Sequence, residues 1–183
     1  KVDPQTGAIS MMAKDVKLGS ILPDFNMGWS NNFDYKGINL GVTFSARIGG
    51  IALSSTESFL DQYGVSERSG RARDNGGVPV NYGKVDAKTY YQGIAGYGAY
   101  YAYSATNVRL QELSLGYTLP AKWFRDKVRM TVSFVGRNLW MIYCKAPFDP
   151  EVTASTTNNY YQSYDYFMLP STRNLGFSVK LQF

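Results

Sequence analysis

The stretch that decides the fold is the last thirteen residues, Ser171 to Phe183, with the sequence STRNLGFSVKLQF. From Asn174 onward, apolar residues take every second position, and polar or small residues take the positions between them. The apolar residues are Leu175, Phe177, Val179, Leu181 and Phe183. Because successive side chains of a β-strand point to opposite faces, the pattern predicts one strand with an apolar face and a polar face.

Two classes of protein contain such strands. Strands of outer-membrane barrels alternate in this way, apolar toward lipid and polar toward the lumen. Half-buried strands of soluble antiparallel sheets alternate too. The segment ends on Phe183, and outer-membrane barrels commonly end on Phe with apolar residues at alternate positions before it. We therefore favour the barrel for this segment.

The same alternation recurs earlier in the chain. It predicts antiparallel strands over about 24–35, 38–49, 107–119, 128–141 and 171–183. Lys36-Gly37 predicts a tight turn, because Gly tolerates the positive φ of hairpin turns. The third strand changes phase near Gln111-Glu112, which indicates a β-bulge or an upper part that faces protein instead of lipid. The fourth loses its alternation around Gly136.

Short and long connections alternate between these strands. The segments 36–37 and 120–127 are short, whereas 1–23, 50–106 and 142–170 are long and without sustained alternation. A loop of some 55 residues is unusual in a compact soluble domain. Outer-membrane barrels have long extracellular loops and short periplasmic turns. We therefore expect the three long segments to be irregular extracellular loops and the C-terminus to be periplasmic.

Composition excludes several functions. The chain has 19 Lys and Arg against 14 Asp and Glu, and no basic stripe, so we expect no nucleic-acid partner. It lacks His and has one Cys, which removes His-based metal sites and Ser-His-Asp triads. No run of about 18 apolar residues predicts a membrane-spanning helix. We expect no catalytic residue, no metal and no cofactor.

Five tyrosines in the long 50–106 segment are candidate ligand contacts, since aromatic faces bind the apolar faces of ligands such as sugars. They are Tyr90, Tyr91, Tyr97, Tyr100 and Tyr101. The alternative, which we favour, is that they pack the loop onto itself, onto neighbouring loops or onto a lid protein. Asp149 and Glu151 have a spacing that suggests a glycosidase pair. Pro150 between them indicates a turn instead, and we interpret this segment as a structural anchor.

Several short motifs, taken together, resemble a known family. They are Pro23-Asp24-Phe25, WSNNFDYKG at 29–37, VRLQELSLGYTLP at 108–120, GRNL at 136–139, FDPEV at 148–152 and the final Phe183. In this order they resemble the C-terminal region of SusC/RagA-type TonB-dependent transporters. The family often has an Asp- and Gly-rich turn before Pro-Asp-Phe. Here the segment 3–7 has one acid only, too few oxygen ligands to predict a calcium site.

The resemblance implies an all-β fold: the last five antiparallel strands of a 22-stranded barrel in the cell outer membrane. It implies TonB-energised import of oligosaccharides or peptides. The implied partners are the rest of the barrel and its plug, a SusD-like surface lipoprotein, TonB and outer-membrane lipid. Arg47, Arg109, Arg129 and Arg137 would then face the lumen, tuning its polarity or pairing with plug carboxylates.

Two other functions compete with this interpretation. A secreted carbohydrate-binding β-sandwich would share the alternating strands and the tyrosines. A glycan-degrading enzyme would need an acid/base constellation that the sequence lacks. The barrel makes a distinct prediction, because a one-residue slip in register would invert every side chain. The predicted lipid-facing residues are Phe25, Met27, Trp29, Ile38, Leu40, Val42, Phe44, Phe177, Val179 and Leu181; the predicted inward-facing residues are Asn26, Ser30, Asn39, Thr43, Ser178 and Lys180.

Overall fold

The computed structural model describes residues 3, 5–6, 8–9, 15–80, 83–124, 127–152, 154 and 161–183. The chain forms two compact units. The loop unit comprises Lys1–Ile21, Ile51–Ser104 and Pro150–Leu169. The sheet unit comprises Leu22–Gly50, Ala105–Asp149 and Pro170–Phe183.

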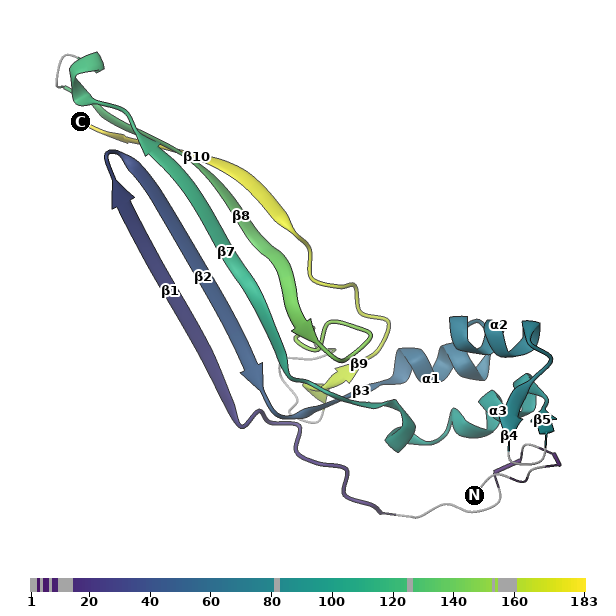
Figure 1. Ribbon diagram of the computed structural model, residues 1–183. Coiled ribbons are helices and arrows are strands. Elements are labelled where there is room, and N and C mark those ends of the chain that lie inside the picture. The colour runs from purple at the N-terminus through teal and green to yellow at the C-terminus, as the bar shows by residue number, and fades with distance from the viewer. Residues whose placement is uncertain are drawn as a thin grey trace. The chain divides into compact units, whose positions relative to one another are not determined.

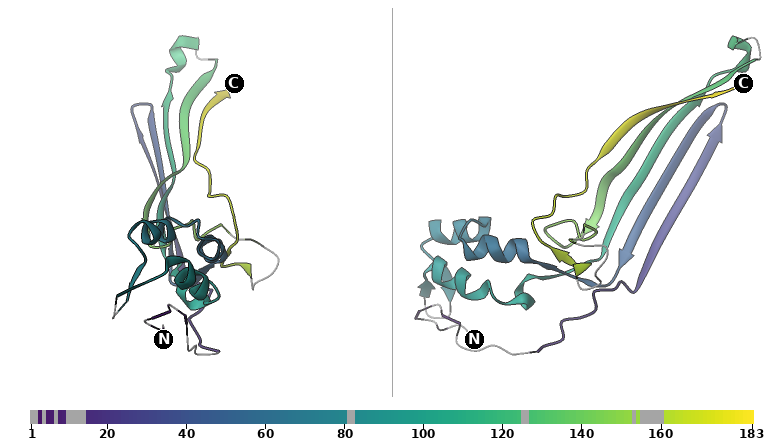
Figure 2. Two further views of the ribbon diagram at one scale, coloured as in Figure 1. Left: turned by 90° about the vertical axis from the view of Figure 1, so that its right-hand side faces the viewer. Right: turned by 180° about the vertical axis from the view of Figure 1, so that it is seen from behind.

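The sheet unit is one antiparallel sheet of five strands in the order β1-β2-β7-β8-β10 (Figure 1). The strands are β1 (Phe25–Tyr35), β2 (Ile38–Ile48), β7 (Asn107–Thr118), β8 (Arg129–Cys144) and β10 (Asn174–Gln182). They run side by side in every view (Figure 2). The expected all-β architecture is confirmed. Two bounds differ from the prediction by three residues and the others by one at most: β8 extends to Cys144 instead of 141, and β10 begins at Asn174 instead of 171.

The β1–β2 connection is the tight turn that the sequence predicts. Lys36 has φ 48° and Gly37 has φ 88°, and two consecutive positive φ angles define the type I′ turn that suits hairpins. A Cβ on Gly37 would lie 2.9 Å from the carbonyl oxygen of Thr118 on β7. Gly37 is therefore required both for its backbone conformation and for the close approach of the neighbouring strand.

Two irregular residues explain where the alternation of the sequence fails. In β7, Leu110 pairs with Phe44 and Glu112 with Thr43, so Gln111 is an extra residue, the predicted bulge. In β8, Arg137 pairs with Glu112 and Trp140 pairs with Leu110. Two residues of β8 therefore lie opposite the single residue Gln111 of β7. Asn138 lies there with φ 51°, a conformation that Asn tolerates better than most residues.

The register brings the alternating residues of all five strands onto common faces. Trp29 pairs with Phe44, Leu40 with Leu115, Leu115 with Phe134, and Phe134 with Phe177. The other residues of the five strands whose side chains share this face are apolar, apart from Asn31 and Gly136. Asn26, Ser30, Asn39, Thr43, Ser178 and Lys180 lie on the opposite face. The predicted outward and inward sets are thus separated onto two faces of one sheet.

The loop unit is not the irregular segment that the sequence suggests, and for 50–106 that prediction is wrong. Its helices are α1 (Ser55–Gln62), α2 (Glu67–Asp74), α3 (Ala87–Ile94) and the 3₁₀ helix η1 (Gly98–Tyr101). Its short strands are β3 (Ile51–Ser54), β4 (Val78–Val80), β5 (Gly83–Val85), β6 (Ala102–Ser104) and β9 (Tyr164–Asp165). β6, β3 and β9 form one small sheet, and β4 and β5 form another.

Side-chain caps start the three α-helices. Ser54, Ser66 and Asp86 each accept a hydrogen bond from the backbone N–H three residues later, which satisfies one of the free donors of a helix N-terminus. Each helix has eight residues, too few for an amphipathic period to be recognised in the sequence. No helix within the described residues is long and apolar enough to cross a membrane.

Candidate functional site

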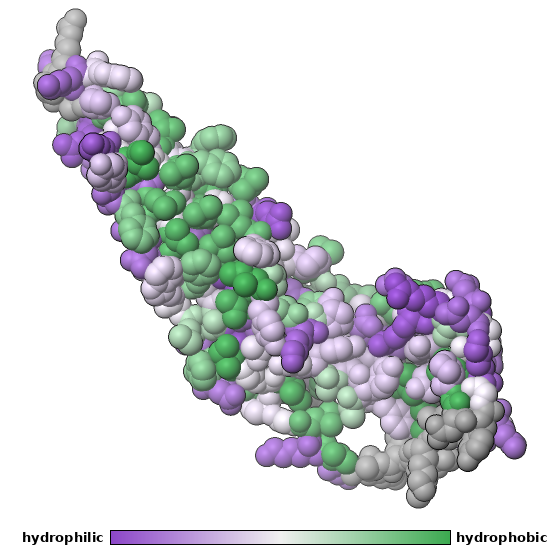
Figure 3. Space-filling view, in the orientation of Figure 1, coloured by the Kyte–Doolittle hydropathy of each residue, from purple (hydrophilic) through white to green (hydrophobic). Residues whose placement is uncertain are grey.

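The apolar face of the sheet is the first candidate surface. Its aromatic side chains form contacts between strands: the ring centroids of Trp29 and Phe44 lie 5.5 Å apart, as do those of Phe134 and Phe177. Trp29 is 53% exposed and Phe177 is 81% exposed. Figure 3 shows apolar residues gathered over the strands. An apolar face of this extent marks an interaction surface or a membrane contact.

The two outer strands define the edges of this sheet. β1 pairs with β2, and β10 pairs with β8, so each has an outer side that pairs with no strand of the described residues. An open edge is not tolerated in hydrocarbon, where every backbone polar group needs a partner within the protein. The geometry therefore suits strands that continue a larger sheet in a longer protein.

Three of the motif segments meet in one polar cluster, which we call the Arg109 cluster (Arg109, Asp149, Asn138, Asn107 and Ser171), and its central ion pair is buried. The Arg109 guanidinium donates to Asp149 from Nη2 at 2.8 Å, and the two side chains are only 4% and 7% exposed. Nε of Arg109 donates to Oδ1 of Asn107 at 3.3 Å. Charges with so little access to water need both a partner and saturated hydrogen bonds.

Asn138 extends this cluster toward the last strand. Its Oδ1 accepts from Nη1 of Arg109 at 3.4 Å, and its Nδ2 donates to Oγ of Ser171 at 2.8 Å and to the carbonyl oxygen of Thr172 at 3.3 Å. Ser171 in turn donates to Asp149. The two ends of the 150–170 segment are therefore held together, and the expected anchoring role of Asp149 matches these contacts.

The arginines predicted to face the lumen differ in their environment. Arg137 on β8 pairs with Glu112 on β7 at 2.8 Å, and both side chains are accessible, at 66% and 38%. Arg109 and Arg137 thus have carboxylate partners within this chain instead of requiring a plug. No signal local to one strand predicts the Arg109 cluster, because its members lie up to 64 residues apart in the sequence, from Asn107 to Ser171.

In the loop unit, a second buried charge organises the helices. Asp61 is 0% exposed. Its carboxylate accepts hydrogen bonds from the hydroxyls of Ser66 at 2.6 Å and Tyr101 at 2.8 Å and from Nε of Arg68 at 2.9 Å, and it forms an ion pair with Nη2 of Arg68 at 2.7 Å. The guanidinium of Arg68 lies 5.3 Å from the ring centroid of Tyr100 and 5.4 Å from that of Tyr101. Burial and the hydrogen bond to Asp61 raise the pKa of Tyr101.

The five candidate tyrosines lie in and after α3 but do not form one exposed surface. Tyr91 and Tyr101 are buried, at 8% and 2% exposure. Tyr91 packs with Ala87 and Ile94, and Tyr90 and Tyr97 pack partly against that core. Tyr100 is 45% exposed. The structure thus leaves Tyr100 as the candidate with the most accessible ring.

An aromatic group that we did not single out in the sequence is more exposed. Tyr166 and Phe167 are each 55% exposed, and both rings contact Phe59 of α1 with centroids 5.9 Å away. Phe167 has φ 51°, and its N–H donates to Oγ1 of Thr56 at 2.7 Å. The run of apolar residues from Tyr166 to Leu169 was the signal that could have indicated it.

Comparison with known proteins gives matches in sequence and in structure, while no protein-family model matches the chain. "TonB-dependent receptor P3" of Formosa agariphila is 28% identical over 185 residues, covering 97% of this chain and 18% of that protein. A solved structure of the RagAB peptide importer in the open-open state has a TM-score of 0.74 at 18% identity, covering 100% of this chain and 21% of that one. A structure of the RagAB peptide transporter has a TM-score of 0.69 at 18% identity, covering 98% of this chain and 21% of that one.

The chain thus spans about a fifth of the length of these relatives. The sequence match supports a TonB-dependent receptor, and the structural matches show a shared fold with RagAB chains. Together they agree with the resemblance expected from the motifs: the chain is similar in sequence to part of a TonB-dependent receptor and shares its fold with part of the RagAB chains.

Proposed function

We propose that this chain is part of the wall and outer loops of an outer-membrane active transporter that imports oligosaccharides or peptides. In this proposal TonB supplies the energy, a SusD-like surface lipoprotein captures the ligand, and the remaining strands and plug come from the rest of the protein. The chain itself has no catalytic role. Its apolar face contacts lipid, and its polar face lines the lumen.

One observation carries this proposal: the register of five strands places apolar residues on one face, which is left exposed, and mostly polar or small residues on the other. Lipid-facing and lumen-facing residues of a membrane barrel alternate in this way. A soluble sandwich would instead cover the apolar face with a second sheet about 10 Å away. In the described sheet unit, Phe177 and Trp29 have no such cover.

The arrangement of strand ends supports the orientation. Tyr35 pairs with Ile38, Thr118 with Thr131, and Gln182 with Arg129, so the two short connections and the C-terminus lie at one end of the sheet (Figure 1). Both long connections leave from the opposite end. Since short turns of such barrels are periplasmic and long loops extracellular, we place the C-terminus in the periplasm.

The class of ligand is supported by the relatives more than by the sheet. The RagAB structures are named as peptide importers, which favours peptides. Oligosaccharides remain candidates because accessible aromatic rings such as Tyr100, Tyr166 and Phe167 can contact the apolar face of a sugar as well as apolar side chains of a peptide.

Uptake by cells tests the proposal. The gene of the full-length transporter is deleted and restored, and uptake of radiolabelled oligopeptides and oligosaccharides is measured with and without a functional TonB. We expect one ligand class to enter only when both the transporter and TonB are present. Uptake that is unchanged by the deletion, or independent of TonB, would contradict the proposal.

Behaviour in detergent separates the barrel from the secreted sandwich. The full-length protein should be extracted from the outer membrane only with detergent and should show the heat-dependent gel mobility of a barrel. A monodisperse protein in buffer without detergent or lipid would favour the sandwich.

A further inference from the structure

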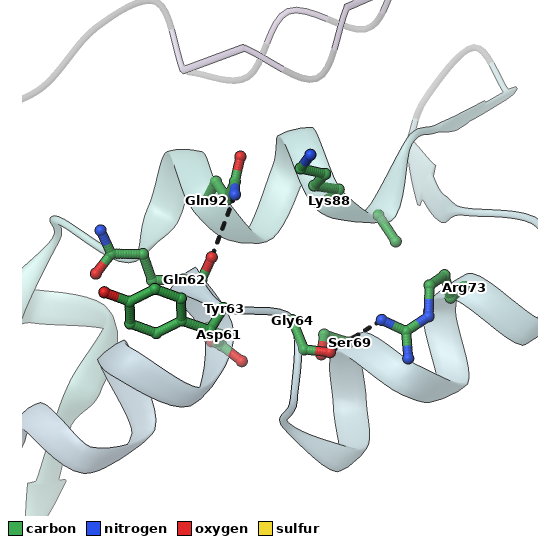
Figure 4. Close-up of a pocket in the computed structure, with 9 residues that line it drawn as sticks. Asp61, Gln62, Tyr63, Gly64, Ser69, Arg73, Lys88 and Gln92 are labelled. Carbon is green, nitrogen blue, oxygen red and sulfur yellow. Dashed lines mark hydrogen bonds between the residues drawn. The ribbon is translucent and has the colours of Figure 1, made fainter.

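The loop unit contains a small hollow between its three helices. It has a volume of about 150 Å³ and is lined by the end of α1 and the residues after it, by one side of α2 and by α3. Figure 4 shows Lys88 and Gln92 on α3, with Gln62, Gly64, Ser69 and Arg73 across the hollow. The volume corresponds to about five water molecules at roughly 30 Å³ each, enough for one small polar group.

The acidic side chain of the hollow is already engaged. Asp61 is the one acid among the residues that line it. Its two oxygens accept hydrogen bonds from Ser66, Tyr101 and Nε of Arg68, and Nη2 of Arg68 lies 2.7 Å away as an ion-pair partner. A carboxylate engaged in this way has little capacity left for a further cation. The buried carboxylate of Asp61 is paired with Arg68, which also contacts Glu57 at 3.1 Å.

Two cations line the hollow without a carboxylate at ion-pair distance among the described residues. Arg73 donates from Nη1 to the carbonyl oxygen of Gly64 at 2.9 Å, which leaves most of its five N–H groups available. Lys88 has no ion pair with a described residue. Asp86, two residues before Lys88, accepts hydrogen bonds from the N–H and Oγ1 of Thr89 as the cap of α3, and the nearby charge of Lys88 is a lesser contribution to its lowered pKa.

Two backbone acceptors of the hollow are occupied, while charged donors remain. The carbonyl oxygen of Gly64 accepts from Arg73, and that of Gln62 accepts from Nε2 of Gln92 at 3.3 Å. Gln92 retains a second amide hydrogen, and Arg73 and Lys88 retain several. A site with an excess of charged donors is complementary to an anion with acceptor oxygens, and Arg binds carboxylates well through its planar fork.

We infer that this hollow binds a carboxylate of the imported ligand, through Arg73 and Lys88 with Gln92 as a neutral donor. The inference rests on the proposed role as an importer and narrows its ligand to one that carries acid groups. An acidic peptide side chain or peptide C-terminus and a uronic acid of an oligosaccharide present the same group. The hollow selects the carboxylate, and the remainder of the ligand lies outside it.

Equilibrium binding to the full-length transporter in detergent tests this inference. Two acidic probes, triglutamate peptide and trigalacturonate, are compared by calorimetry with two neutral probes, triglutamine peptide and maltotriose. We expect at least one acidic probe to bind about tenfold more tightly than its neutral counterpart. The probe that does so identifies the peptide or the saccharide as the source of the carboxylate.

The double variant Arg73→Gln/Lys88→Gln should remove this preference, with a loss of about tenfold in affinity for the acidic probe. Arg71→Gln is the control for Arg73→Gln: it removes one positive charge two residues from Arg73, on a residue that pairs with Glu67 and does not line the hollow. It should change the affinity less than twofold. Because Arg73 and Lys88 are exposed, neither variant should disturb folding, which heat-dependent gel mobility checks.

Equal binding of acidic and neutral probes, or equal loss in the double variant and in Arg71→Gln, would overturn the inference. These outcomes are distinct from a failure of the proposed function. If labelled neutral ligands still enter cells only when the transporter and TonB are present, the proposed import function is supported and the carboxylate site is refuted. If an acidic probe binds through Arg73 and Lys88 but no ligand enters cells, the carboxylate site is supported and the proposed import function is refuted.

Discussion

The two Arg–carboxylate pairs between β7, β8 and the turn after β8 should differ greatly in their contribution to stability. Arg109–Asp149 and Arg137–Glu112 have the same N–O distance of 2.8 Å. They differ in burial: the first pair is 4% and 7% exposed, the second 66% and 38%. The Coulomb attraction of an exposed pair is screened by water, whereas removing one member of a buried pair leaves an uncompensated charge.

The free energy of unfolding should reflect this difference. Arg109→Met removes one partner and leaves Asp149 buried and charged, which should cost about 3–5 kcal/mol. Arg137→Met should cost about 0–1 kcal/mol, the range for exposed pairs. Asp149→Asn keeps the shape of the side chain but leaves Arg109 unpaired. The double variant Arg109→Met/Asp149→Asn leaves no buried charge and should cost less than the sum of the two single variants.

The assay is urea unfolding of the full-length transporter in detergent, read by the loss of heat-dependent gel mobility, with all four variants compared at one pH and salt concentration. The double-mutant cycle isolates the interaction of Arg109 with Asp149 from their other contacts. Equal costs for Arg109→Met and Arg137→Met would refute the reasoning, as would costs of Arg109→Met and Asp149→Asn that simply add.

Three further predictions follow from other parts of the chain. If Val42 faces lipid near the midplane, Val42→Arg should lower the stability of the membrane-inserted protein by about 2–4 kcal/mol and reduce its insertion into liposomes. Thr43→Arg, on the opposite face, should insert normally. Equal insertion of the two variants would contradict the assigned faces. Asn138→Ala should be about 1 kcal/mol less stable than Asn138→Gly in urea, because both lose the side-chain hydrogen bonds but only Gly adopts φ 51° without strain; an Ala variant as stable as the Gly variant would contradict this. Burial and the hydrogen bond to Asp61 raise the pKa of Tyr101 in the folded protein. The stabilisation by the neutral Tyr101 side chain is therefore complete below about pH 10, where the phenol of the unfolded chain ionises, and is lost as the pH rises from there toward the folded pKa. Protease resistance of the loop unit should fall above about pH 10 in the native protein and fall less steeply in Tyr101→Phe.

Much of the sheet could be predicted from local sequence. The five strands, the Lys36-Gly37 turn and the bulge at Gln111 all follow from a period of two and from the places where it changes phase. The extension of β8 to Cys144 was missed because an extra residue, with Asn138 at positive φ, interrupts the alternation. The helices of the loop unit were missed because eight residues are too few to establish a helical period.

The sequence by itself determined that the strands have an apolar and a polar side, since the pleat turns successive side chains to opposite faces wherever a strand forms. Only the tertiary structure decided that these sides coincide across five strands, because register depends on pairing between distant segments. It alone decided that Arg109, Asn138 and Asp149 meet, and that Tyr101 is buried against Asp61 while Arg73 and Lys88 line a hollow. Burial and charge compensation depend on which residues come together in space, and residue spacing along the chain carries little information about that.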